Sequence, residues 1–152
     1  MTVYLALGTN LGDRQFNLQE ARTLIAGKIG SFSAISSIYE TEPWGFKSEN
    51  QFLNQVVAVE TDLNPLEILN LTKEIERQIG RKEKTGDSYQ DRLIDIDLIL
   101  YGDTVLNTKR LQLPHPLFHK RRFVLEPLHE IAPDLGHPVL GKTVEQLLRE
   151  LN

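Results

Sequence analysis

The segment LIDIDLILY, residues 93–101, constrains the fold more than any other part of the sequence. Leucine and β-branched side chains are typical of a strand inside a sheet, because they pack well on a pleated, buried surface. Alternate side chains of a strand point to opposite faces, so Asp95 and Asp97 are expected to share one face. The apolar side chains expected on the opposite face are Ile94, Ile96, Leu98 and Leu100.

Two like charges on one face of a buried strand need an explanation. Their Cα atoms would lie roughly 7 Å apart, and the repulsion would cost about 2 kcal/mol at an effective dielectric constant of about 20. Mg²⁺ is commonly held by one or two carboxylates together with phosphate oxygens and water. Asp95 and Asp97 are therefore candidate metal ligands, although an Asp-x-Asp pair alone more often faces solvent.

Length and composition limit the class of protein. The 152 residues suit a single domain, 1–152, and the chain contains no cysteine. A net charge of -4 argues against a general nucleic-acid binder, and no apolar run approaches membrane-spanning length. We expect a cytoplasmic protein, taken as a monomer, that acts on small molecules and binds neither nucleic acid nor membrane.

Basic residues nevertheless gather in the second half of the chain. Any one group is typical of a solvated loop, but several groups around a carboxylate pair suggest a site for a polyanion that also carries a metal. The groups are Arg81, Lys82 and Lys84, then Lys109 and Arg110, then Lys120, Arg121 and Arg122.

Hydrophobic spacing and turn residues predict the order of elements. The predicted elements are a strand at 2–8, a helix from Asp13 to about 27, strands at about 32–41 and 52–63, a helix at 65–79, the aspartate strand, a short partner strand for it at about 104–107, and helices at about 119–130 and 142–151. The β-α-β-β-α-β order predicts an α+β, ferredoxin-like antiparallel sheet backed by helices, with C-terminal helical additions. This architecture alone does not determine function.

Two further segments suggest phosphate binding. GTNLGDR, residues 8–14, has glycines at a strand-to-helix turn but lacks the phosphate-loop pattern, so we expect a tight turn that directs Asn10 toward the sheet. His115 stands between two prolines, where a constrained imidazole suits either a phosphate contact or a structural hydrogen bond. Arg92 either reaches a phosphate or pairs with a nearby aspartate.

A separate group suggests recognition of a flat ring. Asn54 interrupts an apolar strand, and its carboxamide matches the amide-like edge of a heterocycle. Phe52 and Phe123 could sandwich such a ring, although both residues are as compatible with a core position.

Several motifs in this order resemble the 6-hydroxymethyl-7,8-dihydropterin pyrophosphokinase family of folate biosynthesis. The motifs are LGTNLGDR, YETEPWG followed by FLNQVV, IERQIGRK, RLIDIDLILYG, and LPHP with RRFVLEPL. The resemblance runs nearly end to end. It implies transfer of a pyrophosphoryl group from ATP to the hydroxymethyl group of a dihydropterin, release of AMP, two Mg²⁺ ions on the aspartate pair, and a fold similar to the order predicted above.

The same resemblance implies roles for individual residues. Asp95 and Asp97 would bind metal, and Arg81 and Arg92 would stabilise the triphosphate during catalysis. The implied nucleotide side comprises Lys73, Glu76, the Leu98 backbone, Arg110, His115 and Arg121. The implied pterin side comprises Phe52, Asn54, Phe123 and the backbone near Thr41 and Trp44, with Asn10 in support. Loops 43–51 and 81–91 would close over the substrates.

The chain departs from the family pattern in two places. The family usually has Trp-Gly-Pro-Arg before the aspartate strand, whereas this chain has YQDR at 89–92 and so carries an additional negative charge at Asp91. Glu42 replaces a smaller residue in the pterin loop.

Two other classes of protein fit parts of the pattern. One is a glycosyltransferase-like or nuclease-like enzyme with a two-metal site, and the other is a non-catalytic ferredoxin-like module that binds RNA. The element order disfavours the first, and the aspartates on a central strand disfavour the second.

Overall fold

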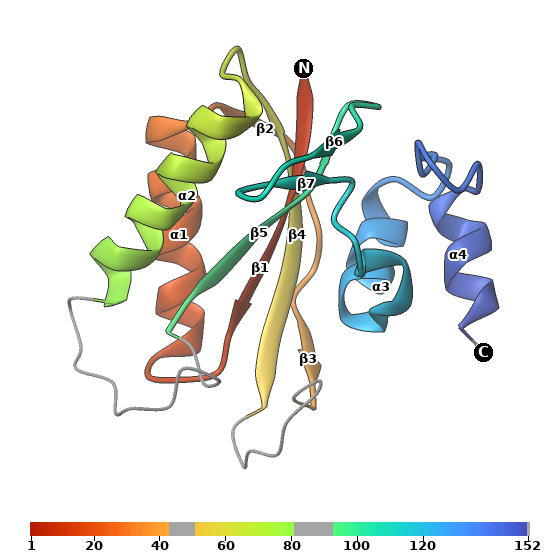
Figure 1. The fold of residues 1–152 in the computed structure, drawn as a ribbon. Coiled ribbons are helices and arrows are strands. Elements are labelled where there is room, and N and C mark those ends of the chain that lie inside the picture. The colour runs from red at the N-terminus through yellow and green to blue at the C-terminus, as the bar shows by residue number, and fades with distance from the viewer. Residues whose placement is uncertain (43–50, 81–92, 152) are drawn as a thin grey trace.

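A sheet with helices on both faces organises the chain (Figure 1). The computed structural model describes residues 1–42, 51–80 and 93–151. The elements are β1 (Thr2–Thr9), α1 (Arg14–Lys28), β2 (Ser31–Ile35), β3 (Tyr39–Thr41), β4 (Phe52–Glu60), α2 (Pro65–Gly80), β5 (Asp95–Tyr101), β6 (Leu106–Asn107), β7 (Gln112–Leu113), a 3₁₀ turn (Phe118–Lys120), α3 (Arg122–Ile131) and α4 (Val144–Glu150).

The strand order confirms the predicted fold class. The order is β2-β4-β1-β5 with antiparallel neighbours, and β3 also pairs with β4. Helices α1 and α2 cover one face, and α3 and α4 form a separate layer on the other (Figure 1). This arrangement is an α+β, ferredoxin-like antiparallel sheet with C-terminal helical additions, as the sequence predicts.

Each helix on the first face starts and packs as its sequence indicates. The Asp13 side chain caps α1 by accepting a hydrogen bond from the Phe16 backbone N–H at 3.1 Å. Leu18, Ala21 and Ile25 then face the sheet and are fully buried. The same core contains the buried side of α2, so a continuous apolar layer lies between these helices and the sheet.

The aspartate strand contains a β-bulge that the sequence did not reveal. Leu98 pairs with Leu5, while Leu100 pairs with Tyr4, so Ile99 is an extra residue on β5. An extra residue reverses the alternation of side chains beyond it. The prediction for Leu100 was therefore wrong, because this residue packs with α3 and α4 on the opposite face from Leu98.

The predicted strand at 32–41 is interrupted. It forms β2 and β3, which pair with different parts of β4. At the break, the Ser36 hydroxyl accepts the Val56 N–H at 3.0 Å, in place of a backbone carbonyl. A side chain that satisfies this donor lets the backbone leave the regular ladder at residues 36–38.

Two predictions for the C-terminal half also need correction. The strand predicted at 104–107 is β6, which pairs with β7 rather than with β5. The helix predicted at 119–130 is the 3₁₀ turn followed by α3, in which Pro127 lies beyond the first turn. Within the described ranges, no helix combines the length and apolar character needed to cross a membrane.

Candidate active site

The aspartate pair lies on the face of the sheet opposite α1 and α2. Asp95 pairs with Gly8 of β1, and Asp97 pairs with Ala6, so both carboxylates share this face as predicted. Both lie before the bulge, where the alternation of β5 is still regular. Each aspartate is half-buried.

The pKa of Asp97 reflects its surroundings. Burial first, and then the neighbouring carboxylates of Asp95 and Glu76, raise it to about 7, although Arg121 and Lys73 oppose the rise. A largely buried carboxylate near two others resists ionisation, because its charge is poorly solvated and the nearby cations only partly balance it. This part of the protein therefore favours an additional cation.

Glu76 holds the aspartate strand against α2. Its Oε2 atom accepts the Ile96 N–H at 2.7 Å, and its Oε1 atom accepts from the Lys73 ammonium at 3.3 Å. Burial raises the pKa of Glu76. The backbone between Asp95 and Asp97 is thus fixed by a helix residue, which orients both carboxylates.

The donor set suits a hard divalent cation. Across the described ranges, no group of three or more His, Cys, Asp or Glu residues is arranged to hold a metal ion. The pair Asp95 and Asp97 alone would leave most coordination positions for water and phosphate oxygens. Mg²⁺ accepts this kind of coordination, whereas structural zinc requires a closed set of protein ligands.

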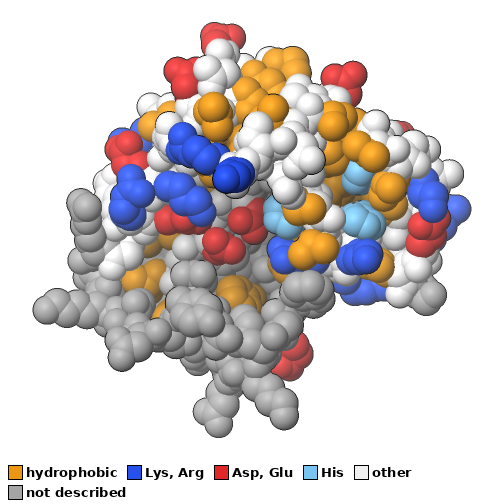
Figure 2. Space-filling view, in the orientation of Figure 1, with side chains coloured by type: hydrophobic (Ala, Val, Ile, Leu, Met, Phe, Trp, Pro, Cys, Tyr) orange, Lys and Arg blue, Asp and Glu red, His pale blue; other side chains and the backbone are white. Residues whose placement is uncertain are grey.

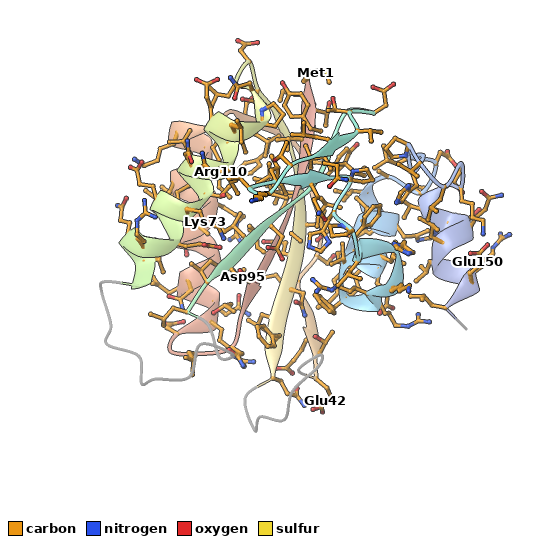
Figure 3. All side chains as sticks on the ribbon, in the orientation of Figure 1. Met1, Glu42, Lys73, Asp95, Arg110 and Glu150 are labelled. Atoms are coloured by element: carbon orange, nitrogen blue, oxygen red, sulfur yellow. The ribbon has the colours of Figure 1, made fainter. Side chains whose placement is uncertain are left out.

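A cleft of about 250 Å³ opens beside Asp97. It contains four residues assigned to the nucleotide side from the sequence, namely Lys73, Leu98, Arg110 and His115. The other lining residues are Leu69, Ile96, Lys109, Leu111, Gln112 and Pro116. Figure 2 shows basic side chains bordering acidic ones in this view, and Figure 3 shows Arg110, Lys73 and Asp95 one below another, with Lys73 on α2 and Asp95 on β5.

His115 has a defined ring orientation. Its Nδ1 atom accepts the Leu117 N–H at 3.1 Å, and its backbone N–H donates to the Ile99 carbonyl at 2.9 Å. Burial first, and then Arg121, lower its pKa to about 4, although Asp95 opposes the shift. The imidazole is therefore neutral at physiological pH, with its proton on Nε2, and that N–H can donate to an anionic oxygen.

Asn54 lies in the same row of the sheet as Asp95. Gly8 pairs with Asp95 on one side and with Asn54 on the other. The Asn54 Nδ2 group donates to the Thr41 hydroxyl at 2.6 Å and to the Tyr39 carbonyl at 3.5 Å. Its Oδ1 atom is consequently the polar atom on the Gly8 side.

Gly8 keeps the surface between these two groups open. A Cβ atom there would lie 3.5 Å from the Asn54 Oδ1 atom and 3.6 Å from the Phe52 ring. Phe52 is two residues from Asn54 on β4, so both side chains are on this face. Phe123 reaches the face from α3, with the Arg121 guanidinium 5.7 Å from its ring centroid.

Some sequence-derived assignments lie outside the described residues. They are Arg81, Arg92 and Trp44, together with loop 81–91, the 43–50 part of loop 43–51, and the departures at 89–92. Glu42 is described, and its carboxylate accepts the Gln51 side-chain N–H at 3.0 Å. Asn10 is buried, as expected for a supporting residue.

The structure also places in the site residues to which the sequence analysis gave no individual role. Lys109 and Gln112 line the cleft. Lys109 could have been found from the sequence, because it belongs to the basic pair Lys109-Arg110. Gln112 belongs to no sequence pattern that predicts a role in the site. Gly8 had been interpreted only as part of a turn, because its position opposite Asn54 depends on strand register.

Comparison with known proteins identifies the family. Residues 4–133 match the family model described as 7,8-dihydro-6-hydroxymethylpterin-pyrophosphokinase (HPPK). The chain belongs to this family. The resemblance inferred from the sequence motifs is thereby confirmed, and membership disfavours the glycosyltransferase-like, nuclease-like and RNA-binding alternatives.

Two relatives of this pyrophosphokinase chain match it over nearly their full length. A 2-amino-4-hydroxy-6-hydroxymethyldihydropteridine pyrophosphokinase of Porphyromonas gingivalis is 46% identical over 138 residues, covering 90% of this chain and 93% of the relative. One of the same name from Aquifex aeolicus is 40% identical over 149 residues, covering 98% and 91%.

Solved structures share the fold of this pyrophosphokinase chain. The Plasmodium falciparum HPPK-DHPS structure with pteroate matches with a TM-score of 0.78 at 19% identity. The match covers 98% of this chain and 42% of that one, so the chain spans less than half of the Plasmodium protein. At this level of identity the likeness supports the ferredoxin-like fold.

Proposed function

We propose that this protein transfers the pyrophosphoryl group of ATP to the hydroxymethyl group of 6-hydroxymethyl-7,8-dihydropterin, releasing AMP, as a step of folate biosynthesis. The observation that carries the proposal is the row Asp95, Gly8, Asn54 across β5, β1 and β4. Neighbouring strands are about 4.8 Å apart, so the row is about 10 Å long. At this spacing, a flat bicyclic ring fits with its edge at the Asn54 amide and its hydroxymethyl arm directed toward a phosphate site at Asp95.

We assign Asp95 and Asp97 as ligands of two Mg²⁺ ions. The fit rests on the carboxylate pair and on the raised pKa of Asp97, which reflects burial first and the neighbouring carboxylates of Asp95 and Glu76 second. Bound Mg²⁺ would neutralise phosphate charge and orient the triphosphate. Glu76 would keep the two carboxylates in register through the Ile96 N–H.

The protein's contribution to the transfer is positioning and charge stabilisation. The acceptor hydroxyl oxygen forms a bond to the β-phosphorus and loses its proton, while the bond from that phosphorus to the α–β bridging oxygen breaks and AMP leaves. We assign Lys73, Arg110 and Arg121 to stabilise phosphate charge, and His115 to donate its Nε2–H to a phosphate oxygen. The Leu98 backbone would contact adenine.

The remaining assignments complete the two substrate sites. Asn54 Oδ1 would accept a hydrogen bond from the edge of the pterin ring, and Phe52 and Phe123 would pack on the faces of the ring. Three assignments rest on the sequence resemblance alone, namely Arg81 and Arg92 on the triphosphate and Trp44 beside the pterin. Thr41 contacts the Asn54 amide and would border the ring. We also propose that the enzyme works as a cytoplasmic monomer.

An AMP-release assay tests this function. We expect AMP only when ATP, Mg²⁺ and the hydroxymethyl pterin are all present. Asp97→Asn should lower kcat at least a thousandfold, because phosphoryl-type transfer depends on charge stabilisation. The matched control is Asp103→Asn, which removes a carboxylate from the exposed turn after β5. Pterin-independent AMP release, or equal activity of the two variants, would contradict the proposal.

A further inference from the structure

The Glu130 carboxylate, near the end of α3, makes a dense set of contacts with the β2–β3 segment. Its two oxygens accept the Ser37 backbone N–H at 3.0 and 3.1 Å. They also accept the Ser37 hydroxyl at 2.9 Å and the Tyr39 phenol at 2.8 Å. A single exposed carboxylate therefore receives hydrogen bonds from three donor groups that are distant from it in sequence.

The contacted segment has few other attachments. Ser37 lies in the break between β2 and β3, and the three-residue β3 pairs, within the described ranges, with β4 alone. From the other face, the Arg14 guanidinium binds the Glu40 carboxylate at 2.9 Å. A short strand at a break depends on such side-chain contacts for its position, because it has few ladder hydrogen bonds.

This segment in turn orients Asn54. The Asn54 amide donates to the Thr41 hydroxyl and to the Tyr39 carbonyl, both on β3. The helix that carries Glu130 also carries Phe123. Glu130 thus connects the two elements that border the proposed pterin site. These are α3, which carries Phe123, and β3, whose residues hydrogen-bond the Asn54 amide.

We propose that Glu130 is a positioning residue of the acceptor site, that is, of the proposed pterin site. Glu130 holds α3 against β3 and thereby sets the placement of Phe123 relative to Asn54. The proposal deepens the proposed function and rests on it. Two pKa shifts agree with the contact. Hydrogen bonding from Tyr39 lowers the pKa of Glu130, and burial together with Glu130 raises the pKa of Tyr39 to about 12.

Steady-state kinetics of Glu130→Gln provide the test. Glutamine keeps the size of the side chain but loses the charge and one acceptor oxygen. We expect the KM for the pterin to rise about fivefold or more, with the KM for ATP and kcat changed less than twofold. Glu130→Asp, which keeps the carboxylate, should restore part of the pterin affinity.

The matched control is Glu145→Gln on α4. This half-buried carboxylate pairs with His129 and Arg149, which lie on α3 and α4 and not on β3, so its loss should leave both KM values unchanged. Tyr39→Phe removes one donor from the Glu130 contact. Combined with Glu130→Gln, it should raise the pterin KM less than the product of the separate effects, because both changes break one contact.

A readout independent of activity is the Asn54 side-chain amide in an NMR spectrum. We expect its two N–H signals to shift in Glu130→Gln and to remain in place in Glu145→Gln. If Glu130→Gln lowers Tm but leaves the pterin KM and the Asn54 signals unchanged, the residue is only structural and the proposal is wrong. Absence of pterin-dependent AMP release by the wild type would instead contradict the proposed function.

Discussion

At the scale of single residues, the aspartate pair shows the electrostatic cost of holding two carboxylates close together on one strand. Asp97 is held in a place that raises its pKa to about 7, first through burial and then through Asp95 and Glu76. The ionised form is therefore less stable in the folded metal-free protein than in the unfolded chain. We expect a divalent cation and a triphosphate, bound as proposed, to remove this cost.

The raised pKa predicts how metal-free stability depends on pH. The folded pKa of about 7 exceeds the ordinary value of 3.8, so Asp97 contributes stability below pH 3.8 and loses it as pH rises through 7. The loss approaches ~1.4 kcal/mol per pH unit between these values. In EDTA at pH 8, Asp97→Asn should therefore exceed the wild type in free energy of unfolding by on the order of 4 kcal/mol.

Urea unfolding at pH 5 and pH 8 measures this difference. Other titrating groups are common to both proteins, so the comparison between wild type and variant isolates Asp97. The advantage of Asp97→Asn should shrink toward pH 5. Parallel pH profiles for the two proteins would show that the Asp97 carboxyl is not perturbed in the fold.

At the scale of elements, the connections between helices and strands allow little freedom. Gly30 joins α1 to β2, and a Cβ atom there would lie only 2.0 Å from the Glu60 carbonyl oxygen. At Gly27, near the end of α1, a Cβ atom would meet no atom of the described residues within 4 Å other than those of its chain neighbours and of the helix's own backbone. Gly30 is thus required because the backbone of β4 comes so close, whereas at Gly27 the helix has room for a larger side chain.

Alanine substitutions at these two glycines should have opposite effects. Gly30→Ala forces backbone movement at the edge of the sheet and should lower the free energy of unfolding by about 3 kcal/mol. Gly27→Ala reduces the entropy of the unfolded chain and should raise it by about 0.5 kcal/mol. Urea unfolding of both variants is the measurement, and a stable Gly30→Ala protein would contradict the described approach of β2 to β4.

At the scale of the whole molecule, the candidate site draws on elements from both halves of the chain. Strands β1, β4 and β5 form its floor, α2 supplies Lys73 and Glu76, and the segment before the 3₁₀ turn supplies His115. Ligand binding should therefore stabilise the entire fold, because the unfolded chain cannot bring these groups together.

Magnesium should control stabilisation by nucleotide. At a nucleotide-analogue concentration of about 100 times Kd, the folded state gains ~2.7 kcal/mol, which corresponds to a rise in Tm of roughly 5–10 °C. We expect most of this rise to be lost in EDTA, and to be lost also in Asp95→Asn with Mg²⁺ present. An equal rise in thermal scans with and without Mg²⁺ would show that the triphosphate is held without the aspartate pair.

Local patterns in the sequence were sufficient for much of this protein. Alternation placed Asp95 and Asp97 on one face, Asp13 marked the start of α1, and the order of elements predicted the ferredoxin-like sheet. These features depend on residues close together in the chain, and the physics of strands and helices acts on such neighbours directly. The motif resemblance supplied the family and the site assignments that local patterns could not.

Only the tertiary structure decided the remaining features. The bulge at Ile99 moved Leu100 to the other face, the pairing of Gly8 with Asp95 and Asn54 formed the central row of the site, and Glu130 reached Ser37 across 93 positions of sequence. Each of these features depends on strand register or on the docking of a helix. The interactions that stabilise such features join segments far apart in the chain. By itself, the sequence determined which residues could form a site, and packing of the two halves determined how those residues meet.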